Sequence, residues 1–90
     1  MAEDDKIRLE DAILDRFAMS AYQTRQWLQD SPEVNAAAGE IGLCGPALAR
    51  EVFHAMIRLK ERGLIRYIGG ATWERDYCHA LHSVRETAVP

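Results

Sequence analysis

Residues 58–70, with the sequence RLKERGLIRYIGG, change their period within one short segment. Charged, helix-favouring residues lead to Gly63, after which residues 64–68 alternate as a half-buried strand does. Gly63 can supply the left-handed residue that ends a helix, and Gly69-Gly70 can adopt the positive φ angles of a two-residue hairpin turn. The segment therefore predicts a helix that is joined to a β-hairpin by a single glycine.

The helix before Gly63 is predicted over residues 46–62. Pro46 suits its first turn, where the missing N–H would have no partner inside the helix. Five apolar residues then recur at spacings of three and four, which predicts one buried face: Leu48, Val52, Ala55, Met56 and Leu59. After the hairpin turn, the sequence ATWERDY is predicted to return as the second strand.

Two further helices are predicted in the first third of the chain. Residues 6–19 carry apolar residues close to helical spacing, with acids at the start, where the helix dipole favours them. A second helix over AYQTRQWLQD can be capped by Ser20 or, alternatively, by Thr24. Residues 32–45 contain three glycines, and we expect a loop with one helical turn there.

Length and composition predict one small cytoplasmic domain. The chain has 90 residues, of which 48% are apolar and 28% charged, as in folded globular chains. We expect a domain over 1–90 with its core in 6–75 and a C-terminal extension over 76–90. No apolar run approaches the length of a membrane span, and the acidic N-terminus is unlike a secretion signal. Cys44 and Cys78 are therefore expected to be free thiols.

The segment MIRLKERGLIRYIGGATWER resembles the end of the recognition helix and the wing of winged helix-turn-helix transcriptional regulators. Six residues occupy the positions of that motif: Val52, Met56, Leu59, Gly63, Leu64 and Ile65. The resemblance implies an α+β, mainly α fold, with three helices and a C-terminal two-stranded wing. It also implies a regulator that binds double-stranded DNA. We expect it to act as a dimer, because one domain of this size offers few base contacts and two half-sites would supply the missing affinity.

The resemblance places the DNA contacts on helix 46–62 and on the wing, residues 64–77. Arg50 and His54 are the candidates for reading base edges. Four other arginines are expected at phosphates. The complete predicted set is Ala47, Arg50, Glu51, His54, Arg58, Arg62, Arg66, Thr72 and Arg75. We expect the first helix and residues 76–90, which include Leu81 and Val84, to form the dimer surface.

Two features depart from the family's pattern. Glu51 and Phe53 stand where groove-facing residues are usually small or hydroxylated, and a carboxylate repels phosphates. The segment before Pro46 is also longer than the motif's tight turn, so either an extra structural turn is present or the second helix is displaced. The alternative function is therefore protein interaction without DNA, through helix 46–62 or through the acidic N-terminal helix.

The charge distribution favours the C-terminal half as the DNA-binding part. Residues 1–43 hold four cations against nine acids, a net charge of −5, whereas residues 44–75 hold six against three, a net charge of +3. The more basic half is the one that contains the predicted recognition helix and wing.

Metal binding and catalysis are weaker hypotheses. Cys78, His79 and His82 are chemically acceptable zinc ligands, but Cys44, the distant fourth, has no paired ligand beside it. A Cys-His pair of Cys78 with His54 or His79 lacks a third orienting group, and no phosphate-binding glycine loop is present. We therefore expect no metal, no cofactor and no enzymatic activity.

Overall fold

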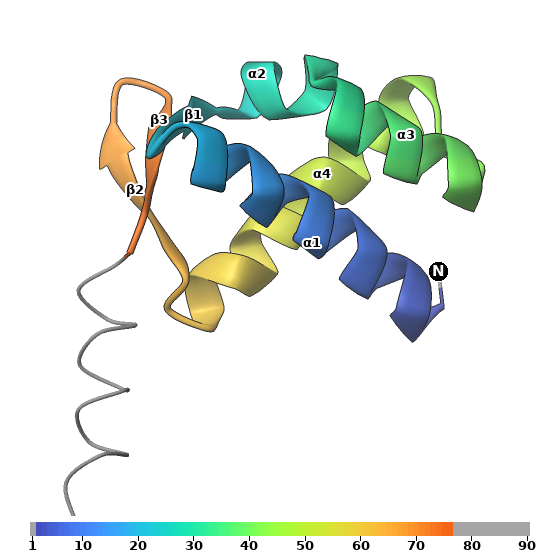
Figure 1. The fold of residues 1–90 in the computed structure, drawn as a ribbon, viewed down its shortest axis with the longest axis horizontal. Coiled ribbons are helices and arrows are strands. Elements are labelled where there is room, and N and C mark those ends of the chain that lie inside the picture. The colour runs from blue at the N-terminus through green and yellow to red at the C-terminus, as the bar shows by residue number, and fades with distance from the viewer. Residues whose placement is uncertain (1, 77–90) are drawn as a thin grey trace, which may run out of the picture.

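The computed structural model of the protein describes residues 2–76, which form a mainly helical fold with a small antiparallel sheet (Figure 1). Along the chain the elements are α1 (Glu3–Met19), β1 (Tyr22–Thr24), α2 (Arg25–Asp30), α3 (Pro32–Ile41), α4 (Gly45–Glu61), β2 (Ile65–Gly69) and β3 (Thr72–Arg75). The sheet lies at one end of the helices and α3 at the other. The α+β, mainly α class is confirmed, although four helices and three strands replace the predicted three and two.

The two long helices, α1 and α4, supply most of the core. In α1, Leu9, Ile13 and Phe17 are fully buried at intervals of four residues. All five residues predicted for the inner face of α4 are buried, and the helix starts and ends one residue earlier than predicted. Trp73 and Ile65 extend this core from the helices into the sheet.

The end of α4 forms as the sequence predicts. Gly63 has a φ of 74°, in the left-handed region. Its N–H donates to the Lys60 carbonyl at 2.9 Å, and the Leu64 N–H reaches back to the Leu59 carbonyl at 3.0 Å. This pattern satisfies carbonyls that the helix itself leaves without partners, and it turns the chain directly into β2.

The prediction of a helix starting at Ser20 is wrong, because residues 22–24 form β1. This strand pairs with β3, so a partner about fifty residues away determines its conformation. Thr24, the alternative cap, is the one that starts α2: its hydroxyl oxygen accepts from the Trp27 N–H at 3.1 Å.

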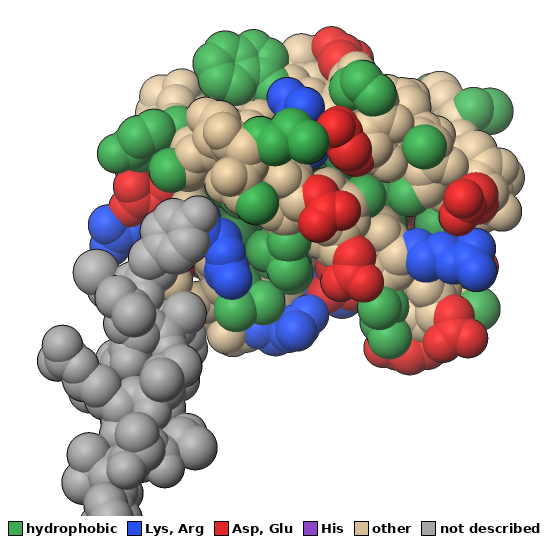
Figure 2. Space-filling view, in the orientation of Figure 1, with side chains coloured by type: hydrophobic (Ala, Val, Ile, Leu, Met, Phe, Trp, Pro, Cys, Tyr) green, Lys and Arg blue, Asp and Glu red, His purple; other side chains and the backbone are tan. Residues whose placement is uncertain are grey.

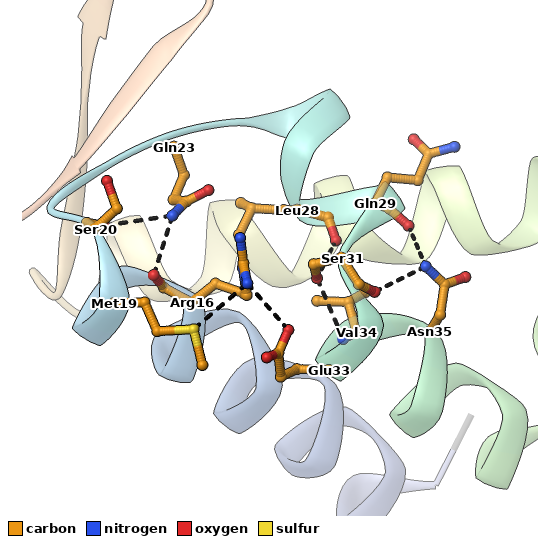
Figure 3. A network of polar contacts seen from close by, with 10 residues as sticks. All are labelled: Arg16, Met19, Ser20, Gln23, Leu28, Gln29, Ser31, Glu33, Val34 and Asn35. Carbon is orange, nitrogen blue, oxygen red and sulfur yellow. Dashed lines mark hydrogen bonds and ion pairs between the residues drawn. The ribbon is translucent and has the colours of Figure 1, made fainter.

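The prediction of a loop over residues 32–45 is also wrong, because α3 occupies most of that range. Ser31 caps α3, accepting from the Val34 N–H at 3.3 Å while its hydroxyl donates to the Leu28 carbonyl at 2.8 Å (Figure 3). Pro32 takes the first turn, and Gly42 ends the helix with a φ of 86°. These signals at both ends outweigh the cost of Gly39 inside the helix. The long segment before Pro46 is thus explained by an additional helix.

The sheet has the order β1-β3-β2, so the last strand lies in the middle. The hairpin turn is centred on Gly70 and Ala71, one residue later than predicted, with φ angles of 57° and 64°. Gly69 pairs with Thr72 after a register shift, which moves the turn along the chain. The strand missed in the sequence is β1, because its conformation depends on pairing with a distant segment and leaves no local sequence pattern.

Residues 77–90 lie outside the described part of the chain, and with them the end of the predicted wing and most of the predicted extension. Within residues 2–76, no helix combines the length and the hydrophobicity that crossing a membrane requires.

Candidate functional site: the outer face of α4 and the adjacent hairpin

The outer face of α4 presents Arg50 and His54, the two residues predicted to read bases. Their side chains are 64% and 53% exposed. Both lie beside Glu51, whose Oε1 is 3.7 Å from Arg50 Nε and 3.8 Å from His54 Nδ1. Ala47 is half-buried one turn before Glu51 on the same helix. The structure therefore groups these four predicted residues on one part of α4, with the carboxylate among them.

Arg58 and Arg62 bind a carboxylate of α1. Glu10, only 8% exposed in its side chain, accepts from Arg58 Nε at 3.4 Å and from Arg62 Nη1 at 3.1 Å. This contact joins α1 to the C-terminal half of α4. Each arginine is thus already partly neutralised, which reduces its attraction for a phosphate.

Glu10 was missed in the sequence because it was counted among the surface acids of the first helix. Its position contains a usable signal, since it precedes Ile13 by three residues and therefore shares the buried face of α1. A carboxylate on such a face requires partners of opposite charge.

The hairpin residues predicted to contact DNA also make internal contacts. Arg66 forms an ion pair with Glu74, the residue opposite it in the β2–β3 register. Arg75 donates from Nη1 to the Leu64 carbonyl, close to where the hairpin leaves α4. Thr72 lies at the turn, and its hydroxyl donates to the Gly70 carbonyl at 3.3 Å. Of these three residues, Thr72 is the one at the tip of the hairpin.

An open groove of about 380 Å³ lies between α4 and the hairpin. Its apolar side chains are Phe53 and Ile57 from α4, Tyr67 from β2, Ala71 from the hairpin turn and Trp73 from β3, and its cations are Arg25 from α2 and Lys60 from α4. We call these seven residues the α4–hairpin groove. Phe53, the predicted departure from the family's pattern, is therefore part of a shared apolar surface.

Aromatic contacts fix the shape of the α4–hairpin groove. The rings of Tyr67 and Trp73 meet nearly edge to face, with centroids 5.2 Å apart and planes at 62°. The guanidinium carbon of Arg25 lies 5.3 Å from the centroid of Phe53, a cation–π contact between α2 and α4. No sequence signal identifies Arg25 as a neighbour of Phe53, because β1 and the short α2 bring it there.

The side of the molecule formed by α1 has a different character. Figure 2 shows that acidic, basic and hydrophobic side chains are interspersed there. Close to this side, Arg16 of α1 reaches Glu33 of α3 at 3.3 Å, and the amide of Gln23 donates to the Arg16 carbonyl at 3.0 Å (Figure 3). These contacts hold α1, β1 and α3 together.

Residues 2–76 contain no group of three or more potential metal ligands. Cys44 is exposed and free. Cys78, His79 and His82, the other residues weighed as zinc ligands, lie outside the described residues, as do Leu81 and Val84 of the predicted dimer surface. Comparisons of the chain with protein-family models, with curated proteins and with solved structures find no match.

Proposed function

We propose that the protein is a small winged-helix regulator that binds double-stranded DNA through α4 and the hairpin. One observation supports this most: α3, three connecting residues (42–44) and α4 occur in succession, followed at once by the hairpin. A helix, a short turn containing glycine and a second helix is the arrangement of helix-turn-helix proteins. Here α3 takes the role of the first helix of the pair and α4 that of the recognition helix.

Arg50 and His54 are the proposed base-reading residues. Both are exposed: Arg50 lies in the N-terminal half of α4, the part of a recognition helix that meets base edges, and His54 follows one turn later, at the middle of the helix. A guanidinium in the major groove can donate to a guanine, and the same groove can admit α4 as a whole. Ala47, one turn earlier, is small enough to allow close approach.

The internal ion pairs make some of the proposed arginines weaker candidates for phosphate contacts. Arg58 and Arg62 share Glu10, and Arg66 pairs with Glu74, so each would reach a phosphate only by sharing or leaving a carboxylate. Arg25 and Lys60, which were not among the predicted residues, contribute charge beside the hairpin. Thr72 at the hairpin tip can donate to the DNA backbone.

The test begins with selection of binding sites from a randomised pool of duplexes, using the full chain at low salt. Binding of an enriched duplex is then measured by fluorescence anisotropy for the parent, for Arg50→Ala and for the control Arg8→Ala. Arg8 is 57% exposed and pairs with Glu40, so it matches Arg50 in charge and exposure but lies on α1.

We expect Arg50→Ala to weaken binding by about 1–3 kcal/mol and to relax preference at one base position. Arg8→Ala should change the binding free energy by less than about 0.5 kcal/mol. Added salt should steeply weaken duplex binding by all three proteins. Equal effects of the two substitutions, or no enrichment with folded protein, would refute the proposal.

A dimer is part of the proposal, because one domain of this size makes few base contacts and two half-sites would supply more affinity. A sizing measurement of the free chain and of its complex with the enriched duplex tests it. The second candidate function is a protein-interaction module without DNA binding, and the apolar character of the α4–hairpin groove favours it.

A further inference from the structure

The α4–hairpin groove combines an apolar floor with two cations that form no ion pair within residues 2–76. Among residues 2–76, Arg25 and Lys60 make no ion pair, although most other cations of that range do. No acidic side chain lines the groove. An occupant that carries negative charge would therefore meet two cations that do not already form an ion pair with residues 2–76.

The floor of the groove favours an apolar side chain over a phosphate. Phe53 is 38% exposed and Tyr67 52%, so both keep surface that a partner can remove from water. Burial of that surface stabilises a complex by roughly 25 cal/mol per Å². A phosphate gains nothing from such a floor, because a charged group loses its hydration there.

Stacking of single-stranded bases is also disfavoured. The face of Phe53 that meets Arg25 is covered by the guanidinium, and Trp73 is only 7% exposed. Two of the three aromatic rings are thus poorly placed to offer the open faces that successive bases need.

We propose that the α4–hairpin groove is a docking site for a segment of a partner protein in which a large apolar side chain is flanked by carboxylates. The apolar side chain lies between Phe53 and Tyr67, and the carboxylates meet Arg25 and Lys60. This inference does not depend on DNA binding. If DNA also binds to α4, a segment in the groove would compete with it, and the acidic partner would control occupancy of the DNA.

The experiment is selection from a random peptide library displayed on phage, with the biotinylated full chain as bait. We expect enrichment of peptides that carry an aromatic or long aliphatic residue next to aspartate or glutamate. The strongest peptide is then synthesised with a fluorescent label and titrated against variants by anisotropy.

Three exposed positions provide the variants. Phe53→Ser and Lys60→Glu should each weaken the labelled peptide about tenfold or more, as truncation of a central interface residue does. Ile68→Ser is the matched control: Ile68 is 47% exposed on β2 but does not line the groove, so binding should be unchanged. Thermal melts of all variants show whether the folded state is retained.

Several results would overturn this inference. The inference would be overturned if the enriched peptides lacked acidic residues. It would also be overturned if the labelled peptide bound Lys60→Glu as tightly as the parent, or if Ile68→Ser weakened the peptide as much as Phe53→Ser does. A labelled duplex and a labelled single strand are titrated in parallel. If Phe53→Ser weakens binding of either nucleic acid and no peptide is enriched, the groove belongs to a nucleic-acid interface. If peptides are enriched but the duplex does not bind, only the proposed function is refuted.

Discussion

At the scale of single residues, Glu10 shows how a side chain's role depends on what lies opposite it. The sequence places it in an acidic stretch, which usually marks a solvated start of a helix. In the structure it is buried and binds Arg58 and Arg62, two of the residues for which the sequence predicted phosphate contacts. The pairing of α1 with α4 decides its role, and the spacing of residues within α1 reveals only that Glu10 faces inward.

Removing the charge of Glu10 should therefore destabilise the fold. We expect Glu10→Gln to lower the free energy of unfolding by about 2 kcal/mol, because two arginines lose a charged acceptor in a partly buried place. Chemical denaturation followed by circular dichroism measures the change. The control Glu40→Gln removes an exposed carboxylate that pairs with Arg8, and it should cost less than about 0.5 kcal/mol. Equal losses would show that the Glu10 contacts stabilise the fold no more than an exposed ion pair does.

At the scale of elements, the sequence predicts those whose signals are local. The inner face of α4, its end at Gly63 and the strand after it follow from periodicity and from one glycine, and all were predicted within a residue or two. β1 forms through pairing with β3, and α3 forms because the caps at its two ends outweigh an internal glycine. The local sequence patterns therefore gave the wrong secondary structure in both segments. For the candidate site, the predicted α4 residues do lie together, but neither Arg25 nor the groove was predictable.

Gly39 inside α3 and Gly42 just after its end provide a test with opposite signs. Gly42 has a φ of 86°, so Gly42→Ala should destabilise the fold by about 1 kcal/mol through strain at positive φ. Gly39 lies inside the helix, and a Cβ added there meets no heavy atom within 4 Å. Gly39→Ala should therefore stabilise the fold by about 0.5–1 kcal/mol. Thermal melts of both variants give the comparison, and the same sign for both would contradict the assignment of α3.

At the scale of the whole molecule, one core joins the sheet to the helices. Trp73 and Ile65 from the hairpin pack in the same cluster as Phe17 of α1 and Met56 of α4. A hairpin that shares a core in this way is expected to unfold together with the helices.

The two tryptophans make that expectation measurable. Trp73 is 7% exposed in the sheet, whereas Trp27 is 60% exposed on α2. In the variant Trp27→Phe, fluorescence reports on the sheet alone, and in Trp73→Phe it reports on α2. We expect the urea midpoint of each signal to coincide with that of far-ultraviolet circular dichroism for the same variant. A sheet signal that is lost at lower urea would show that the hairpin opens independently.

The central position of β3 has a consequence for the speed of folding. The hairpin forms between strands that are close in sequence, whereas β1 pairs with a strand about fifty residues further along the chain. Closing so long a loop costs entropy before any strand contact repays it, so the β1–β3 pairing raises the mean sequence separation of contacts in a mostly helical protein. The chain should consequently fold more slowly than a helical bundle of its size, and β3 must be formed or accessible before β1 can pair.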